Sequence, residues 1–312
     1  MDRCGCVASF TRLWFSPEFW RCLHCKAAPP DARQAEASET EESDSGFHLL
    51  YELKPEQARV QFAAWQAAHP EDPMGSAAEA ASYLFEECFR QGLLTSEFFL
   101  DNRRFLGKAA IQPDPGIRSA FFAADLKAQE MARVQLQTDP DDLNALFAMT
   151  LSLGMQADYA SLIDRRQLES LGMIRKADEY AKRLLAANPD ASDAYLALGT
   201  ANYVIGSLSP FKRLFLHFKG ISGDKRLGLE QLEIAALHGH YLRPFAKILL
   251  GLAALREKKY TVARVQLTEL VDEFPANSLF AGELAKLRTL PEATAHGESS
   301  VAHPKELVSP VR

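Results

Sequence analysis

The sequence lacks the features of several large classes of protein. Lysine and arginine together number 35 against 41 acidic residues, which gives a net charge of −6, and the basic residues form only short clusters. Nucleic-acid binders normally carry a basic stripe. No apolar run approaches the ~18 residues that a membrane-spanning helix needs, since the longest, "FAKILLGLAAL", is short and contains Lys247. We therefore expect no nucleic-acid partner and no membrane-spanning helix.

Catalytic motifs are missing as well. The chain has no G-x-S-x-G, no H-E-x-x-H and no G-x-G-x-x-G after a strand. The stretch "GISGDKRLG" spaces Gly223 and Gly228 like the glycines of a phosphate-binding loop, but Leu229 and Glu230 stand where that loop needs Lys and then Ser or Thr. A glutamate at this place would repel a phosphate. We expect no enzymatic activity, no cofactor and no small-molecule substrate.

Cysteine is scarce and unevenly placed. Four of the five cysteines fall within the first 25 residues, as C-x-C followed by C-x-x-C, whereas Cys88 lies on the apolar face of a predicted helix. Four thiolates can form a tetrahedral zinc site, so a zinc-binding protein is one alternative; we favour a leader with incidental cysteines and no metal. The candidate zinc ligands are Cys4, Cys6, Cys22 and Cys25. We expect Cys88 to be buried as a small apolar residue.

The ends of the chain differ in composition from its middle. Arg12, Glu18 and Arg21 interrupt the apolar stretch near the start, which is untypical of a secretory signal. We favour a cytoplasmic protein; the alternative is an exported or periplasmic one whose signal is degraded or wrongly started. Residues 1–45 are predicted to be a cysteine-containing leader and acidic linker, and residues 289–312 a disordered tail.

Helical periodicity fills residues 46–288, and no segment alternates like a strand for long. Four similar turns, each containing a proline, separate helix-like segments: Pro70, Pro140, Pro189 and Pro275. Proline suits such turns because it cannot continue the preceding helix, while acidic residues after it favour the next helix start. The pattern predicts an all-α protein.

The residues before these prolines also repeat. An alanine lies twelve residues before each proline, and in two units a glycine lies twelve residues before that alanine. Small residues of this kind let two antiparallel helices approach closely, and one such pair cannot bury its apolar face alone. The residues expected to serve this packing are Gly46, Ala58, Phe62, Pro70, Ala128, Pro140, Ala177, Pro189, Gly199, Gly251, Ala263, Leu267 and Pro275.

This template resembles the tetratricopeptide repeat. Within it, the run Ser207-Leu208-Ser209-Pro210, then Gly220, Ser222-Gly223-Asp224 and Gly228, resembles the insertion of the tetratricopeptide repeat protein 39 family, also called the inclusion-body-clearance family. The resemblance implies an all-helical scaffold without known chemistry, linked in some members to lipid-droplet or inclusion biology. It carries over no catalytic residue.

The spacing of the prolines predicts insertions. Simple repeats run at ~34 residues, whereas the prolines here are 70, 49 and 86 residues apart. We therefore predict a right-handed α-solenoid of antiparallel helix pairs over residues 46–288, with extra residues between the paired helices. The three insertions are expected at residues 94–116, 157–169 and 207–224.

Short polar motifs receive structural interpretations. Asp224 is expected to cap the helix that follows it, and Gly228 to allow close helix packing. Glu86 and Glu87 are expected on a solvated helix face. His238 and His240 lie at a predicted helix end without an accompanying metal-ligand cluster, so a solvated loop is favoured; likewise Asp141 and Asp142 are expected to start a helix.

The first helix of each pair should line a mainly apolar concave groove. The groove candidates are Tyr51, Phe147, Leu151, Leu196, Tyr203, Phe245, Ile248 and Leu252. One interpretation is a scaffold that binds a protein or peptide partner in this groove; the other is that part of the stripe is ordinary core packing. An alternative function uses the basic amphipathic segment Phe211–Phe218 on a lipid surface, but we favour a lid helix and no membrane contact.

Overall fold

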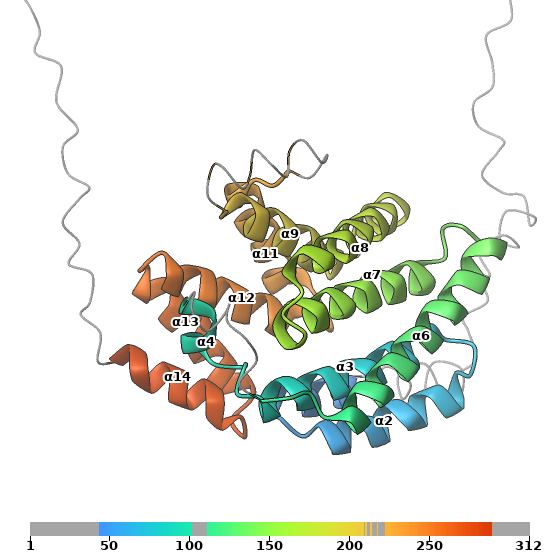
Figure 1. Cartoon of the computed structure of the whole chain (residues 1–312), viewed down its shortest axis with the longest axis horizontal. Helices are drawn as coiled ribbons and strands as arrows, with labels where there is room; N and C mark the ends of the chain where they lie inside the picture. Colours follow the sequence, from blue (N-terminus) through green and yellow to red (C-terminus); the bar gives the residue numbers. More distant parts are fainter. Residues whose placement is uncertain are drawn as a thin grey trace, which may run out of the picture. The chain divides into compact units, whose positions relative to one another are not determined.

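Helices make up all the regular structure in the part of the chain that the structure describes. The computed structural model describes residues 44–101, 111–208 and 222–288, together with residues 210, 213 and 217, and these lie in the compact unit formed by residues 42–312. Helical residues 44–51 come first. They are followed by α2 (Pro55–Ala68), α3 (Pro73–Arg90), α4 (Ser96–Leu100), α6 (Pro115–Thr138), α7 (Leu143–Asp158), the π-helix η1 (Tyr159–Ile163), α8 (Gln167–Ala187), α9 (Ala194–Gly206), α11 (Lys225–His238), α12 (Arg243–Arg256), α13 (Tyr260–Glu273) and α14 (Ser278–Arg288) (Figure 1).

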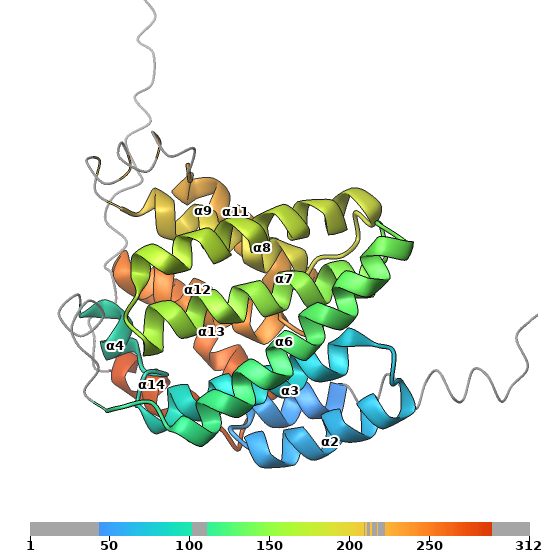
Figure 2. The same ribbon diagram turned by 45° about the vertical axis from the view of Figure 1, so that its right-hand side comes forward.

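The helices pack in neighbouring pairs. α3 packs with α6, α7 with α8, α9 with α11, and α12 with α13, and contacts between α6 and α7, α8 and α9, and α11 and α12 join successive pairs. Figures 1 and 2 both show α6 lying across α3 and α7 running beside α8. The first three of these pairs have extra residues between their partners, as the sequence predicts. The expectation of an all-α protein is confirmed for the described residues.

The alanines of the repeat template are buried, and one template glycine lies at a close helix contact. Ala58, Ala128, Ala177 and Ala263 are all buried. A β-carbon on Gly46 would come within 2.3 Å of the Phe62 ring, so the helix of residues 44–51 approaches α2 more closely than a larger residue would permit.

The four repeated prolines follow helix ends. Pro70, Pro140, Pro189 and Pro275 each come two residues after the last residue of α2, α6, α8 and α13, respectively. Acidic caps start two of the helices that follow these turns, because a carboxylate of Asp72 accepts the N–H of Met74 at 2.9 Å and Asp142 accepts that of Ala145 at 2.8 Å. The predicted helix start at Asp142 is confirmed.

Two helix pairs share an unusual turn. Leu53 and Lys258 have positive φ angles of 62° and 59°, and each lies seven residues after a template glycine. In both turns the next residue donates its N–H to a carbonyl five residues earlier, Lys54 to Leu49 and Lys259 to Ala254. This left-handed ending provides hydrogen-bond donors for carbonyls in the last turn of the helix.

The insertion before α11 follows the sequence-based expectation. Asp224 accepts the N–H groups of Arg226 and Leu227 at 2.8 and 3.1 Å, and a β-carbon on Gly228 would lie 2.4 Å from the backbone nitrogen of Tyr203. The predicted cap and the close packing of α9 and α11 are both confirmed.

The first and last parts of the described chain meet along a seam. The hydroxyl of Tyr51 donates to the carbonyl of Tyr241 at 3.0 Å, and the buried Asn277 donates its side-chain amide to the carbonyl of Tyr51 at 2.7 Å. The ring of Tyr51 also lies 5.4 Å from that of Phe274, and His240 pairs with Asp44 at 2.9 Å. We call these contacts the seam; they tie residues 44–51 to the segment from His240 to α14.

Two expectations need correction. Glu87 is fully buried rather than solvated, because Arg90 and Gln91 donate to its carboxylate and so does the N–H of Asp114. The carboxylate thereby anchors the start of α6 to the end of α3. Residues 44 and 45, placed in the linker by composition, are helical. The insertion at residues 157–169, expected between two paired helices, begins as a continuation of α7 through the π-helix η1.

Candidate functional site: the inner face

Six of the eight groove candidates, all but Tyr203 and Leu252, belong to or pack against two apolar clusters that share residues, and we call the predicted set of eight the inner face. The eight differ in exposure. Tyr51 and Leu196 are buried, and the remaining six are half-buried. Phe147, Leu151, Phe245 and Ile248 pack against the main apolar cluster, so part of the stripe serves as core. Tyr203 and Leu252 belong to none of the described apolar clusters and keep part of their surface in solvent.

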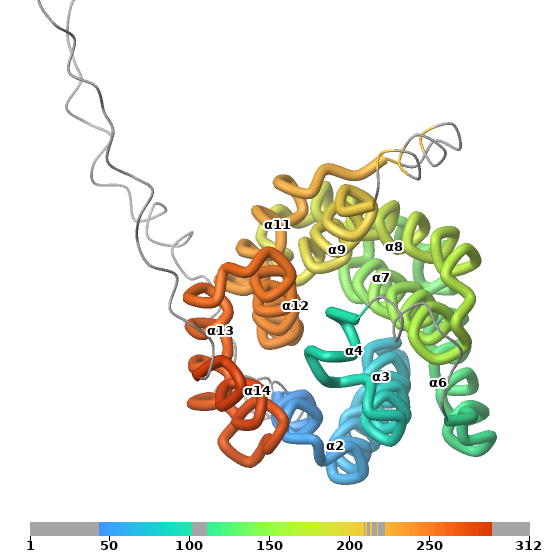
Figure 3. Tube along the Cα trace, turned by 60° about the vertical axis from the view of Figure 1, so that its left-hand side comes forward, coloured from blue at the N-terminus to red at the C-terminus, as the bar shows by residue number. Residues whose placement is uncertain are grey.

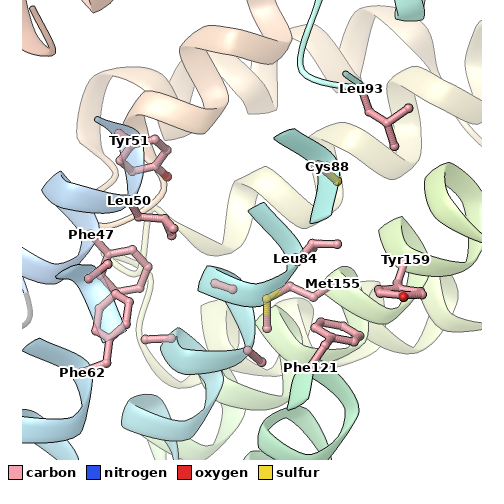
Figure 4. Packing of buried hydrophobic residues seen from close by; sticks show 14 of the residues in the cluster. Phe47, Leu50, Tyr51, Phe62, Leu84, Cys88, Leu93, Phe121, Met155 and Tyr159 are labelled. Atoms are coloured by element: carbon pink, nitrogen blue, oxygen red, sulfur yellow. The ribbon is translucent and has the colours of Figure 1, made fainter. Parts of the chain in front are cut away.

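Aromatic rings link the helices that carry this face. Tyr51 lies 5.9 Å from Phe85 of α3, and Phe85 lies 6.3 Å from Phe245 of α12, measured between ring centroids. Phe147 of α7 stacks against Tyr241 at 6.2 Å. Figure 4 shows neighbouring packing, with Tyr51, Leu50 and Phe47 on one side and Phe121 beside Tyr159 on the other. Aromatic contacts therefore connect residues 44–51 to α3 and α12, and α7 to Tyr241.

Helix α12 carries the longest apolar stripe of the inner face. Phe245, Ile248, Leu252 and Leu255 follow helical spacing and are all half-buried. Because Leu252 lies between two residues that contact the main cluster, it faces the same side as they do. This position makes Leu252 the most informative single residue for testing what the inner face binds.

The short helix α4 lies against the inner face. It packs on α12, and in the view of Figure 3 it lies between α12 and α3. Phe98 of α4 is buried, and the guanidinium carbon of Arg165 lies 4.8 Å from its ring centroid. The composition of this insertion predicted no such position, because the insertion has no helical periodicity long enough to indicate where it packs.

An acidic residue lies at one end of the inner face. Asp158 follows Phe147 and Leu151 at helical spacing on α7, and burial raises the pKa of its carboxyl to about 7. Burial, and then the charge of Asp158, raise the pKa of the Cys88 thiol. The prediction that Cys88 is buried is confirmed, and a thiol kept protonated in this way is a poor nucleophile. The spacing of Asp158 from Leu151 could have revealed it in the sequence.

Tyr203 lies beside a small charged group. Burial raises the pKa of its hydroxyl, and the neighbouring carboxylate of Glu257 adds to the shift. Glu257 itself pairs with Lys225 and with Lys259, each at 2.8 Å. The pairs connect the start of α11 to the turn after α12, so this charged group joins two successive helix pairs beside the inner face.

Other predicted residues lie elsewhere or outside the described residues. Cys4, Cys6, Cys22 and Cys25, and the apolar side chains of the Phe211–Phe218 segment, fall outside them. His238 ends α11 and His240 follows it, and both are exposed, as expected. Among the described residues, no three His, Cys, Asp or Glu side chains gather closely enough to hold a metal ion.

Comparisons with known proteins give no assignment. No protein-family model matches the sequence, and no curated protein matches it significantly. None of the helices that the structure describes is both long and apolar enough to cross a membrane. The chemistry of the inner face, which is apolar and aromatic with one acid and one flanking charged group, is therefore the basis for a functional proposal.

Proposed function

We propose that the protein is a non-enzymatic scaffold that binds a protein or peptide segment on its inner face. In this proposal the described helices form a right-handed, tetratricopeptide-like solenoid of antiparallel pairs. Two features support the architecture: the buried alanines recur at one template position, and the turns at Leu53 and Lys258 are alike. A repeat array of this kind offers extended surfaces for partners.

One observation carries the functional proposal. Two of the inner-face side chains, Tyr203 and Leu252, are half-buried and lie outside the described apolar clusters. A partner segment with apolar anchors would remove their remaining surface from water, at a gain of roughly 25 cal/mol per Å² of apolar surface before the costs of association. The absence of a basic stripe and the net charge of −6 favour a protein partner over a nucleic acid.

The experiment compares matched substitutions on two faces. Leu252→Asp places a charge on the inner face, and Val265→Asp places one on the exposed side of α13. Tagged full-length variants are purified from native cells, co-purifying proteins are quantified by mass spectrometry, and thermal melts verify folding. We expect Leu252→Asp to reduce at least one wild-type partner tenfold or more and Val265→Asp to leave it unchanged. Partner sets that are identical for wild type and Leu252→Asp would refute the assignment.

A further inference from the structure

The insertion between α3 and α6 places a short segment of the chain on the inner face. The first part of this insertion starts at Gly92, which ends α3 with a φ of +66°. It then forms α4, whose five residues are too few to make a stable helix alone. Its shape therefore depends on the surface beneath it, as that of a bound peptide does.

Two kinds of contact hold α4 in place. Phe98 is buried, and Arg165 lies over its ring. At the start of α4, Ser96 donates both its N–H and its hydroxyl to the carboxylate of Glu283, and Glu97 pairs with Lys286 at 2.6 Å. Glu283 and Lys286 belong to α14, at the opposite end of the described chain. One aromatic anchor and one polar clamp thus fix the segment.

The polar contacts of α4 are weak, so Phe98, which is buried in the main apolar cluster, supplies most of its hold on the surface. About half of the Glu97 and Lys286 side-chain surfaces is exposed, and exposed ion pairs contribute little to stability. The segment lies in a connection between two helices that pack on each other without it, since α3 and α6 form a pair. If α4 left the surface, α3 and α6 could therefore remain folded and packed on each other.

We propose that α4 is a tethered ligand of the inner face, and that the external partner carries the same chemistry: a hydroxyl residue, then an acidic residue, then an aromatic anchor. This inference rests on the proposed function and specifies its partner. The partner's aromatic side chain takes the site of Phe98 under Arg165, and its acidic residue pairs with Lys286. A tethered segment competes at an effective concentration of about millimolar, so a partner binds only by displacing it.

The test uses the segment itself as the probe. A fluorescein-labelled, end-blocked peptide of residues 94–101, "LTSEFFLD", is titrated with full-length protein, and fluorescence anisotropy reports binding. We expect the Phe98→Ala protein, whose own segment has lost its anchor, to bind the peptide at least tenfold more tightly than wild type does. The peptide with its own Phe98→Ala change should not bind. If Phe98→Ala lowers folding stability, the double variant Ser96→Ala with Glu97→Ala replaces it in the test. This variant too should bind the peptide more tightly than wild type does.

A charge exchange tests the polar clamp. Lys286→Glu in the Phe98→Ala protein should weaken the peptide at least threefold, and the Glu97→Lys peptide should restore the loss. Failure of the peptide to bind either variant, equal binding by wild type, or insensitivity to the Phe98→Ala peptide change would overturn the proposal. A dimer that exchanges α4 between two copies and disappears in Phe98→Ala would overturn it too.

The two proposals fail in different ways. If the peptide does not bind but Leu252→Asp still loses its cellular partner, only the tethered-ligand proposal fails. If the peptide binds as expected but Leu252→Asp keeps every partner, the intramolecular site stands and the proposed function fails.

Discussion

At the scale of single residues, a buried carboxylate is the most informative group outside the inner face. Asp125 of α6 is fully buried and accepts the side-chain amides of Gln129 and Gln156 at 3.0 and 2.6 Å. The hydroxyl of Ser152 also faces it. Burial nonetheless outweighs these hydrogen bonds and raises the pKa of the carboxyl to about 6.

This shift predicts how stability changes with pH. Because the folded-state pKa of Asp125 exceeds its unfolded value of 3.8, its contribution is fully present below pH ~4 and is lost as the pH rises through ~6, a fall of roughly 2–3 kcal/mol. Asp125→Asn should remove most of this fall and leave stability at pH 7.5 equal or higher. Urea unfolding between pH 4 and 7.5 measures it.

The control for that measurement is an exposed acid of the same type. Asp141→Asn, on the turn before α7, should leave the pH profile as in wild type. A profile for Asp125→Asn that still falls across pH 4 to 6 by the wild-type amount would show that Asp125 does not cause it.

Close approach of backbones gives a second prediction at this scale. A β-carbon on Gly228 would lie 2.4 Å from the nitrogen of Tyr203, whereas one on Gly154 in α7 would meet nothing within 4 Å. Gly228→Ala should therefore destabilise by roughly 1–3 kcal/mol through overpacking, and Gly154→Ala should stabilise by up to about 1 kcal/mol through helix propensity. Urea unfolding at neutral pH compares them, and equal effects of one sign would contradict the packing of α9 on α11.

Sequence reasoning succeeds for residues whose role is local. The cap at Asp224 and the burial of Cys88 were predictable because spacing within one helix decides them. Glu87 was misplaced because its partner N–H belongs to Asp114, 27 residues further along the chain and near the end of the insertion. Asp114 and Pro115 form a local helix-start signal, but that signal does not show that α6 starts beside the end of α3. The position of α4 on the inner face was missed for the same reason.

At the scale of the element, the turn between paired helices offers a test of backbone strain. Lys258, two residues after the end of α12, has a left-handed conformation with φ of 59°, and its side chain is exposed. This conformation costs an L-residue about 1–2 kcal/mol, which glycine avoids. Lys258→Gly should raise the unfolding free energy by roughly 0.5–1 kcal/mol, because glycine also gives the unfolded chain more freedom.

The matched variant for this turn is Lys258→Ala, which removes the same charged side chain but keeps the strained backbone. It should give no gain in urea unfolding. An equal gain from both substitutions would attribute the effect to the lost charge rather than to the turn.

The connections between pairs were harder to predict than the pairs. Asp193, just before α9, accepts the N–H groups of His240, Tyr241 and Leu242 at 2.9 to 3.1 Å and thus holds the start of α12. Nearly fifty residues separate these groups along the chain, so no spacing rule in a single unit indicates the contact.

At the scale of the whole described unit, the seam determines how its first and last helices stay together. Asn277 has two roles there, because its oxygen caps the N–H of Leu279 at 2.9 Å while its amide donates to the carbonyl of Tyr51. Asn277→Asp keeps the cap and replaces the donor with a carboxylate facing a carbonyl. Hydrogen exchange should then rise in residues 44–51 and α14 and stay unchanged in α6 to α8.

This prediction specifies which residues should exchange faster, not how large the increase in hydrogen exchange should be. A uniform rise across all helices would indicate general destabilisation, and no rise in residues 44–51 would show that the seam does not depend on Asn277. The seam could not be predicted from the sequence. The repeat template relates only helices that are neighbours along the chain, and it says nothing about contacts between the first and last helices.

The central claim is that the inner face of the helices is the surface that binds a protein partner. Its most direct test is photo-crosslinking in native cells, with benzoylphenylalanine placed at Leu252 or, as the matched outer position, at Val265. The proposed function predicts a discrete protein adduct from position 252 and none from position 265. Adducts of equal yield from both positions, or none from position 252, would contradict it.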